Sequence, residues 1–190
     1  MESEAAAWNR RYREGSHHSR EPDPFLLFSC EEFVQPLFPR PGIALDLAGG
    51  VGRNAIWLAQ QGWRVRMIDV SDRGVAQARE NAGHYAGNID FEVRDLETFM
   101  ATAAQYDLIL VFFYLQRSLF PQITRSLRPG GLLIYKTYTH LQPAFGKGPS
   151  HPMHLLAKNE LLDAFSDLQV LYYRETVRDR GIAEFLGRKS

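Results

Sequence analysis

The stretch "ALDLAGGVGRNAIWLAQQGWRVRMIDVS", residues 44–71, constrains the fold more than any other part of the chain. An apolar strand carries Asp46, glycines follow at once, a helical pattern begins near Gly52, and a second apolar strand ends at Asp69. Residues without side chains permit a sharp turn and a close approach to the backbone. The pattern therefore predicts a strand–turn–helix–strand unit with two carboxylates beside the turn.

Strand and helix patterns alternate along the rest of the chain, with short links between them. We expect strands over residues 43–47, 64–70, 89–93, 106–113, 132–138, 168–176 and 182–188. Such alternation is typical of a parallel sheet covered by helices. Only "VRDRG" separates the last two strands, which must pair antiparallel because a parallel return needs a long crossover. We predict an α/β, Rossmann-like doubly wound fold whose seven-stranded mixed sheet is mostly parallel, has an antiparallel C-terminal hairpin, and carries helices on both faces.

The length of 190 residues suits one domain with a full core. We therefore expect a single domain over residues 1–190. Residues 1–40 would form an N-terminal cap segment, with a helical patch over 25–37. Residues 41–190 would form the core. A loop over residues 139–158, rich in Pro, Gly and His, would lie over the site.

Composition narrows the classes of partner. Lysine plus arginine and aspartate plus glutamate both number 22, whereas nucleic-acid-binding domains usually carry a basic excess. The single cysteine excludes an internal disulfide, and the histidines lack metal-ligand spacing, so we expect no metal. The N-terminus lacks a signal-peptide pattern, and no apolar run is long enough for a membrane span. We expect a cytoplasmic protein that acts on a small molecule, without nucleic acid or membrane.

Three carboxylates, Asp46, Asp69 and Asp95, end three consecutive predicted strands. Ligands of such sheets bind at the carboxyl ends of the strands, and a carboxylate there can accept hydrogen bonds from ribose hydroxyls. Each of the three could alternatively cap a turn or a helix, but their common edge favours a ligand site.

Two classes of cofactor are consistent with the glycine pattern at this edge. Gly50-x-Gly52-x-x-Ala55 fits the dinucleotide fingerprint, as in a nicotinamide-dependent reductase. Asp46 disfavours that class because its carboxylate would repel a pyrophosphate. A cofactor that carries an ammonium and a sulfonium, S-adenosylmethionine, suits a carboxylate at this place.

The same residues resemble motif I of the class I S-adenosylmethionine-dependent methyltransferases, aspartate-x-Gly-x-Gly-x-Gly. Asp46, Ala48, Gly50 and Gly52 take its positions, with Ala48 in place of the first glycine. "VRDLETF" resembles the segment after the third strand of that family, and "LRPGGLLIYKTY" resembles the entry to its fifth strand. "WNRRY", residues 8–12, and "GRNAIWLAQQG" are similar to the branch that includes the tellurite-resistance and thiopurine enzymes.

The resemblance implies S-adenosyl-L-methionine as cofactor, with Asp95 at the adenine amino group, Leu96 along the ring, and Tyr12 in a segment folded over the cofactor. We expect cofactor contacts from Tyr12, Asp46, Ala48, Gly49, Gly50, Gly52, Arg53, Asp69, Val70, Asp95, Leu96 and Phe112. Of the neighbours Phe112 and Phe113, one would lie in the core and the other would contact the cofactor.

Methyl transfer from a sulfonium depends mainly on alignment, so no universal catalytic residue is expected. Tyr138 and His140 follow the fifth strand and are candidate bases. We expect a methyltransferase that acts on a small acceptor, such as a thiol or a metalloid oxyanion. The alternative from another class is a non-catalytic module that binds S-adenosylmethionine.

Overall fold

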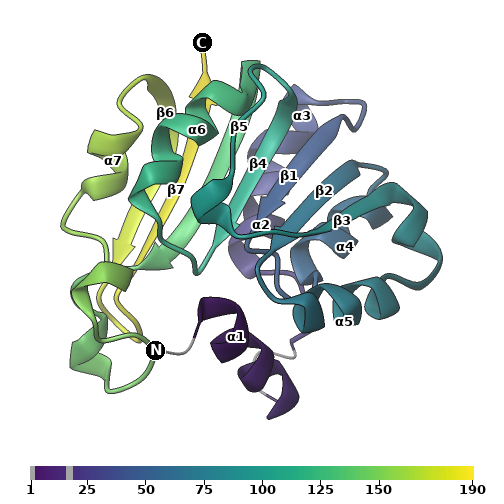
Figure 1. Cartoon of the computed structure of the whole chain (residues 1–190). Coiled ribbons are helices and arrows are strands. Elements are labelled where there is room, and N and C mark those ends of the chain that lie inside the picture. The colour runs from purple at the N-terminus through teal and green to yellow at the C-terminus, as the bar shows by residue number, and fades with distance from the viewer. Residues whose placement is uncertain (1–2, 16–18) are drawn as a thin grey trace. The chain divides into compact units, whose positions relative to one another are not determined.

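The computed structural model describes residues 3–15 and 19–190, so residues 1–2 and 16–18 of the predicted segment 1–40 lie outside the described chain. Two compact units divide it, Met1–Phe99 and Met100–Ser190. The strands follow the order β3-β2-β1-β4-β5-β7-β6 (Figure 1), and this seven-stranded mixed sheet confirms the predicted fold class. The single-domain boundaries stay a prediction.

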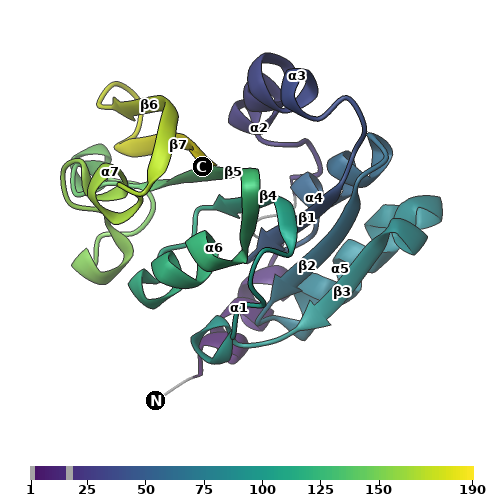
Figure 2. The ribbon, with the colours of Figure 1, turned by 90° about the horizontal axis from the view of Figure 1, so that it is seen from above.

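The first unit contains three parallel strands with helices in the links between them. Its elements are α1 (Glu4–Arg13), α2 (Pro24–Ser29), the π-helical turn η1 (Cys30–Val34), α3 (Gln35–Leu37), β1 (Ile43–Leu47), α4 (Arg53–Gln60), β2 (Arg64–Asp69), α5 (Asp72–Ala82), η2 (Gly83–Asn88), β3 (Ile89–Val93) and η3 (Leu96–Thr98). Strands β1, β2 and β3 pair in parallel, and α5 lies along β2 and β3 (Figure 2). The carboxyl ends of these strands therefore share one edge.

Helix α1 is the element of this unit that the sequence patterns did not reveal. Ser3 caps it by accepting a hydrogen bond from the Ala6 N–H, and Glu4 lies in its first turn. Arginines occupy its last turn, where positive charge interacts favourably with the helix dipole. Half of its residues are polar, three of the others are alanines, and Tyr12 is its buried residue, so no apolar stripe marked it as helical.

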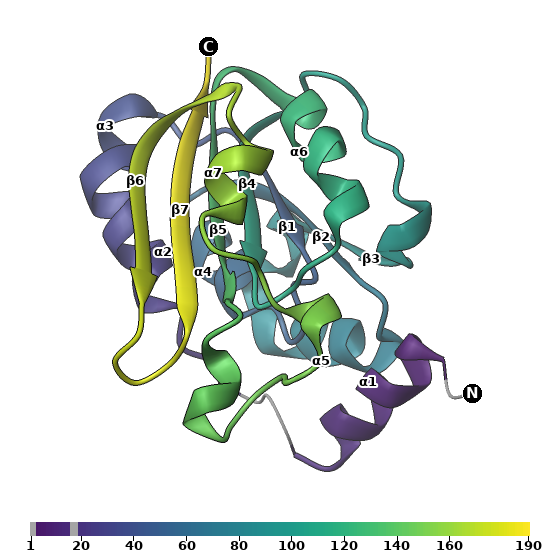
Figure 3. The same ribbon diagram turned by 90° about the vertical axis from the view of Figure 1, so that its left-hand side faces the viewer.

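The second unit contains a four-stranded part of the sheet. Its elements are β4 (Tyr106–Phe112), η4 (Arg117–Leu119), α6 (Phe120–Ser126), β5 (Leu127–Tyr138), η5 (Gln142–Phe145), η6 (Pro152–His154), α7 (Glu160–Ala164), β6 (Leu168–Thr176) and β7 (Ile182–Lys189). Strands β4 and β5 are parallel, whereas β7 runs antiparallel to both β5 and β6. Figure 3 shows the β6–β7 hairpin with α7 beside it, which confirms the predicted C-terminal hairpin.

One local prediction in this unit is wrong. The fifth strand is predicted over residues 132–138, after the segment "RPGG", but β5 already begins at Leu127. The pairing with β4 shifts register between Tyr106 and Leu108, and Gly130 has φ +80°. The strand thus continues through a bulge that contains a left-handed glycine, although proline and glycine favour a turn there.

The loop over residues 139–158 is tied to the unit at several points. Gln142 is buried, and its Oε1 accepts a hydrogen bond from the Gly181 N–H at 3.0 Å. The Arg117 guanidinium pairs with Glu160 and donates to the Leu155 carbonyl at 3.0 Å. Its predicted place over the site stays a prediction. Among the described residues, no helix combines the length and the apolarity needed to cross a membrane.

Candidate functional site

The turn after β1 has the backbone that its glycines suggest. Ala48, Gly50 and Gly52 have φ values of 57°, 58° and 81°, all in the left-handed region. Gly52 is also the N-terminal capping residue of α4. An L-residue such as Ala48 adopts this conformation at a cost of about 1 kcal/mol that glycine largely avoids. The alanine at position 48, where the motif has glycine, therefore strains the backbone.

The space beside these glycines is occupied by the protein's own atoms. A Cβ at Gly50 would lie 2.7 Å from the Tyr12 Oη, and a Cβ at Gly52 would lie 2.9 Å from the Ala78 Cβ. Gly74 on α5 is equally close to Tyr12, with 2.9 Å between a Cβ there and the ring Cε2. Close packing of α1, the turn and α5 thus explains the glycines without a ligand.

Asp69 sits at the end of β2 and holds the turn in place. Its Oδ2 accepts a hydrogen bond from the Gly50 N–H at 2.8 Å, and its Oδ1 accepts one from the Ser71 N–H at 2.9 Å. The side chain is almost fully buried, and burial is the main cause that raises its pKa, while these N–H donors act in the opposite direction. Each carboxylate oxygen has a second lone pair, so Asp69 can still accept from a ribose hydroxyl.

Asp46 lies at the end of β1 and is 2% exposed. Its Oδ2 has no hydrogen-bond partner among the described residues. Burial is the largest cause that raises its pKa to about 7, the negative charge of Asp69 adds to the rise, and Arg53 opposes it. A buried carboxyl oxygen without a partner is costly, and a positively charged ligand would relieve that cost.

Tyr12 and Asn9 hold α1 against α5, and both come from "WNRRY". The Asn9 Oδ1 accepts hydrogen bonds from the Ser71 hydroxyl and from the Arg73 N–H. Burial, followed by the negative charge of Asp69, raises the pKa of the Tyr12 hydroxyl, which therefore stays protonated. Asn9 was not among the predicted residues, although its spacing of three from Tyr12 places both on one helix face.

Arg53 begins α4 and forms an ion pair with Asp23, with 3.3 Å between Nη2 and Oδ2. Asp23 also caps α2, and its own N–H donates to the Asn54 Oδ1 at 2.9 Å. The guanidinium is therefore anchored beside the turn, one-quarter exposed. Its contact with a cofactor carboxylate stays a prediction.

The adenine-side residues follow β3. Strand β3 is parallel to β2 with Asp69 opposite Val93, so Asp95 comes two residues beyond the shared edge. Asp95 is exposed, and its Oδ1 accepts from the Glu97 N–H at 2.8 Å as the cap of η3. Leu96 is buried, whereas Val70 is partly exposed. Asp95 therefore has the capping role considered as its alternative, and its contact with adenine stays a prediction.

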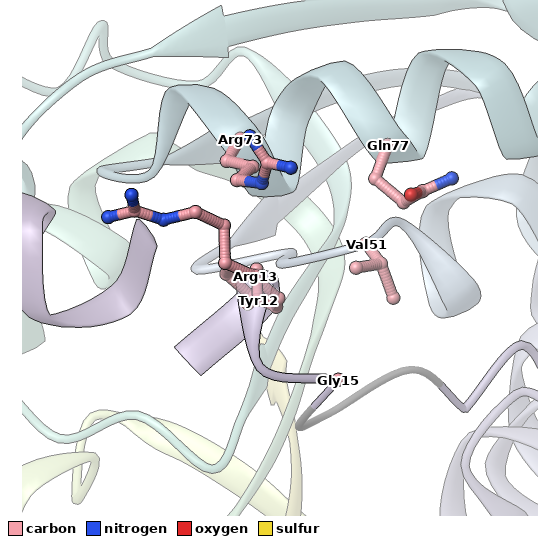
Figure 4. Close-up of a pocket in the computed structure, with 6 residues that line it drawn as sticks. All are labelled: Tyr12, Arg13, Gly15, Val51, Arg73 and Gln77. Atoms are coloured by element: carbon pink, nitrogen blue, oxygen red, sulfur yellow. The ribbon is translucent and has the colours of Figure 1, made fainter. Parts of the chain in front are cut away.

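A pocket of 270 Å³ lies beside this turn (Figure 4). Arg73 and Gln77 of α5 face the C-terminal end of α1 across it, and Val51 of the turn lies between them. Its lining consists of Tyr12, Arg13, Gly15, Val51, Arg73 and Gln77. The two arginines make the lining basic, in contrast to the acidic end of β1 and β2.

In the second unit, the end of β4 carries two phenylalanines with different surroundings. Phe112 is 8% exposed and pairs with Lys136 on β5, which identifies it as the more buried of the two. Phe113 is partly exposed and has φ 57°, its N–H donates to the Lys136 carbonyl at 2.7 Å, and its ring centroid lies 5.1 Å from that of Tyr138. The cofactor contact predicted for Phe112 thus suits Phe113 better, and it stays a prediction.

The candidate bases differ in exposure. Tyr138 is partly exposed and packs against Phe113, whereas His140 is exposed. The rings of His151 and His154 have centroids 6.1 Å apart. No group of three side chains able to hold a metal forms within residues 3–15 and 19–190. Catalytic roles for Tyr138 and His140 stay predictions.

A buried charge network near the same strand end was missed from the sequence. Lys136 and Glu184 face each other across β5 and β7, with 3.2 Å between Nζ and Oε1, and Arg174 on β6 pairs with the other Glu184 oxygen at 2.6 Å. The Lys136 Nζ also lies 5.6 Å from the centre of the Phe113 ring. The sequence feature that could have predicted this network is the presence of charged residues inside otherwise apolar strands.

Part of the chain matches a known family model. Residues 44–131 match the family model described as "Methyltransferase domain". This region begins in β1, includes the glycine turn and the ends of β2 and β3, and reaches into β5.

The curated relatives share less than 30% of their aligned residues with this chain. "Hemagglutinin 1" of Eikenella corrodens is 29% identical over 161 residues, which cover 78% of this chain and 50% of that protein. "Ribosomal RNA small subunit methyltransferase C" of Alcanivorax borkumensis is 28% identical over 149 residues, which cover 74% of this chain and 41% of that protein. The chain thus spans about half the length of the curated relatives it matches.

Solved structures show the same fold over nearly the whole chain. TehB from Haemophilus influenzae matches with a TM-score of 0.74 at 20% identity, over 96% of this chain and 67% of that one. A Burkholderia thailandensis 1,6-didemethyltoxoflavin-N1-methyltransferase with bound S-adenosylhomocysteine matches with a TM-score of 0.72 at 15% identity, over 98% and 87%. These matches agree with the fold that the predicted resemblance implies. The chain therefore has the same fold as these S-adenosylmethionine-dependent methyltransferases, and its residues 44–131 are similar to a methyltransferase domain.

Proposed function

We propose that this protein transfers a methyl group from S-adenosylmethionine to a small-molecule acceptor. The observation that carries the proposal is the buried carboxylate pair at the ends of β1 and β2, in which the Asp46 Oδ2 has no hydrogen-bond partner among the described residues. Such a pair suits a cationic ligand and disfavours the pyrophosphate of a dinucleotide. The match of residues 44–131 to a methyltransferase domain supports the same choice.

Different residues of the chain would bind different parts of the cofactor. Asp69 is oriented by the Gly50 and Ser71 N–H groups, so its free lone pairs are fixed in direction for the ribose hydroxyls. Asp46 supplies negative charge from a site that water does not reach, where electrostatic interactions are strong. Asp95, Leu96, Val70, Arg53 and Tyr12 are the further proposed contacts.

The cofactor, when bound, supplies an activated methyl group whose transfer needs little assistance beyond alignment. Of Phe112 and Phe113, Phe113 is the proposed cofactor contact, and Tyr138, whose ring packs against Phe113 and stays partly exposed, is the proposed acceptor contact. Tyr138 or His140 would remove a proton from a neutral acceptor. A thiolate or a metalloid oxyanion would need no such base.

Small acceptors are favoured by the balanced net charge of the chain and by the small-molecule methyltransferase among the structural matches. An RNA acceptor is the second candidate, because one curated relative is a ribosomal RNA methyltransferase. A location in the cytoplasm remains part of this proposal.

Two experiments test the proposal. Calorimetric titration should show binding of S-adenosylmethionine and of S-adenosylhomocysteine, and no binding of NAD at similar concentrations. Incubation with radiolabelled donor and thiols, selenite, tellurite or ribosomal RNA should then label one class of acceptor. Tight NAD binding without S-adenosylmethionine binding would reverse the choice of cofactor. Cofactor binding with no labelled acceptor in any class would favour the non-catalytic module.

A further inference from the structure

The two carboxylates at the carboxyl edge of the first unit are not equivalent. Asp69 accepts hydrogen bonds from the Gly50 N–H at 2.8 Å and from the Ser71 N–H at 2.9 Å. Asp46 has the Ala55 N–H as its backbone donor, and its Oδ2 has no partner within the described chain. Hydrogen bonds from N–H donors stabilise the ionised form of a carboxyl group. Asp69 is therefore the member of the pair that stays ionised.

A second negative charge beside Asp69 is unfavourable in a buried site. Asp46 is 2% exposed, and its Oδ2 would lie 3.0 Å from a Cβ at Gly49, beneath the turn. When two buried carboxyl groups interact, the proton stays on the one with fewer stabilising contacts. In the protein without cofactor, that group is Asp46.

Within the described part of the first unit, three other polar groups lie near Asp46. Asp69 comes from β2, Arg53 from α4, and the Tyr12 hydroxyl from α1 lies beside the turn at Gly50. The Arg53 charge is shared with Asp23, at 3.3 Å. Burial and Asp69 together raise the pKa of Asp46 to about 7, which agrees with this geometry.

We propose that Asp46 is a proton-exchange site, which releases its proton to solvent when S-adenosylmethionine binds and takes one up again after methyl transfer. The inference rests on the proposed function. The donor carries an ammonium, a sulfonium and a carboxylate, hence a net charge of +1. In methyl transfer the electrons of the carbon–sulfur bond stay on sulfur, so the product is a neutral thioether with no net charge. The site therefore needs the Asp46 charge before the reaction and not after it.

This exchange gives the protein a means to distinguish the donor from the spent cofactor. The two molecules differ by one methyl group and one charge, and a methyl group alone gives little discrimination. An ionised Asp46 favours the donor, whereas a protonated Asp46 does not oppose the neutral product. Acidic conditions should therefore weaken donor binding while product binding changes little.

The expected size of the effect follows from a group that titrates near neutral pH. The dissociation constant for S-adenosylmethionine should rise about tenfold from pH 8 to pH 6. The reason is that the fraction of the cofactor-free protein in which Asp46 is already ionised falls by that factor. At pH 7 about half a proton should be released per donor bound, and at pH 6 nearly one. For S-adenosylhomocysteine the release should be close to zero at both values.

The test is titration calorimetry at pH 6, 7 and 8 in two buffers with different ionisation enthalpies, which reports the protons released per ligand bound. The wild-type protein suffices for the first comparison, that between donor and product. Asp46→Asn keeps the shape of the side chain without the titration, and it should bind the donor with no proton release from this site. Asp90→Asn, at an exposed aspartate on β3, is the matched control and should behave as wild type. The amino group of the ligand titrates equally with all three proteins, so differences between them report on Asp46.

The outcomes separate this inference from the proposed function. If neither ligand binds at any pH, the proposed function fails. If both bind to the wild type with equal proton release, the inference is wrong and the proposed function stands. Undiminished proton release in Asp46→Asn would also overturn the inference, because the proton would then come from another group.

Discussion

The contact between Gly50 and Tyr12 can be tested as a pair. In Gly50→Ala, the new Cβ would lie 2.7 Å from the Tyr12 Oη, far inside the contact distance, at a position where φ is +58°. The left-handed backbone should cost about 1–2 kcal/mol for alanine. The steric overlap should add about 1–3 kcal/mol.

Removing the hydroxyl should relieve only one of these two costs. In Tyr12→Phe the atom next nearest to the alanine Cβ is Cζ at 3.7 Å, an ordinary contact distance. The double variant should therefore regain the steric part, about 1–3 kcal/mol, and keep the backbone part. That difference is the interaction energy of a double-mutant cycle.

Urea unfolding of the wild type, both single variants and the double variant gives this interaction energy. Gly146→Ala is the matched control, because Gly146 has φ +64° in the left-handed region and a Cβ there meets nothing within 4 Å. It should lose only the backbone part, and Tyr12→Phe should not rescue it. If the Gly50 and Tyr12 effects add within about 0.5 kcal/mol, α1 does not pack on the turn as described.

Three further predictions concern polar side chains. The pKa of Asp46 is raised to about 7 in the folded protein, so its stabilising contribution is present at low pH and is lost as pH rises through 7. Between pH 5 and pH 8 the free energy of unfolding should therefore fall by about 3 kcal/mol more in the wild type than in Asp46→Asn, as measured by denaturant titration. Tyr135→Phe should lower the free energy of unfolding by about 1–2 kcal/mol, since the buried hydroxyl donates to the Tyr114 carbonyl at 2.9 Å; an unchanged midpoint would contradict that hydrogen bond. Arg117→Lys should speed amide hydrogen exchange in the loop before α7, because lysine cannot reproduce the two-pronged pairing with Glu160, and equal exchange rates would show that this pairing does not hold the loop.

The order of strands and helices from residue 43 onward could be predicted because apolar periodicity and chain-link lengths are local properties. The strands at 43–47 and 89–93 have the predicted bounds, and the short "VRDRG" link forced the antiparallel hairpin. Local rules failed at "RPGG", because a bulge stabilised by pairing with β4 overrides the turn preference of proline and glycine.

The sequence by itself determined that carboxylates end consecutive strands beside a glycine turn, since strand period and glycine spacing can be read along the chain. Only the tertiary structure decided that α1 packs on the turn, that Asp69 accepts hydrogen bonds from the Gly50 and Ser71 N–H groups, and that the Asp46 Oδ2 has no partner within the described part of the chain. The physical reason is that burial and pairing depend on residues far apart in sequence: Tyr12 meets Gly50 and Gly74 only once the first unit is folded. Residue types and spacing identify the acidic residues at the strand ends, and packing determines how each of them is buried and hydrogen-bonded.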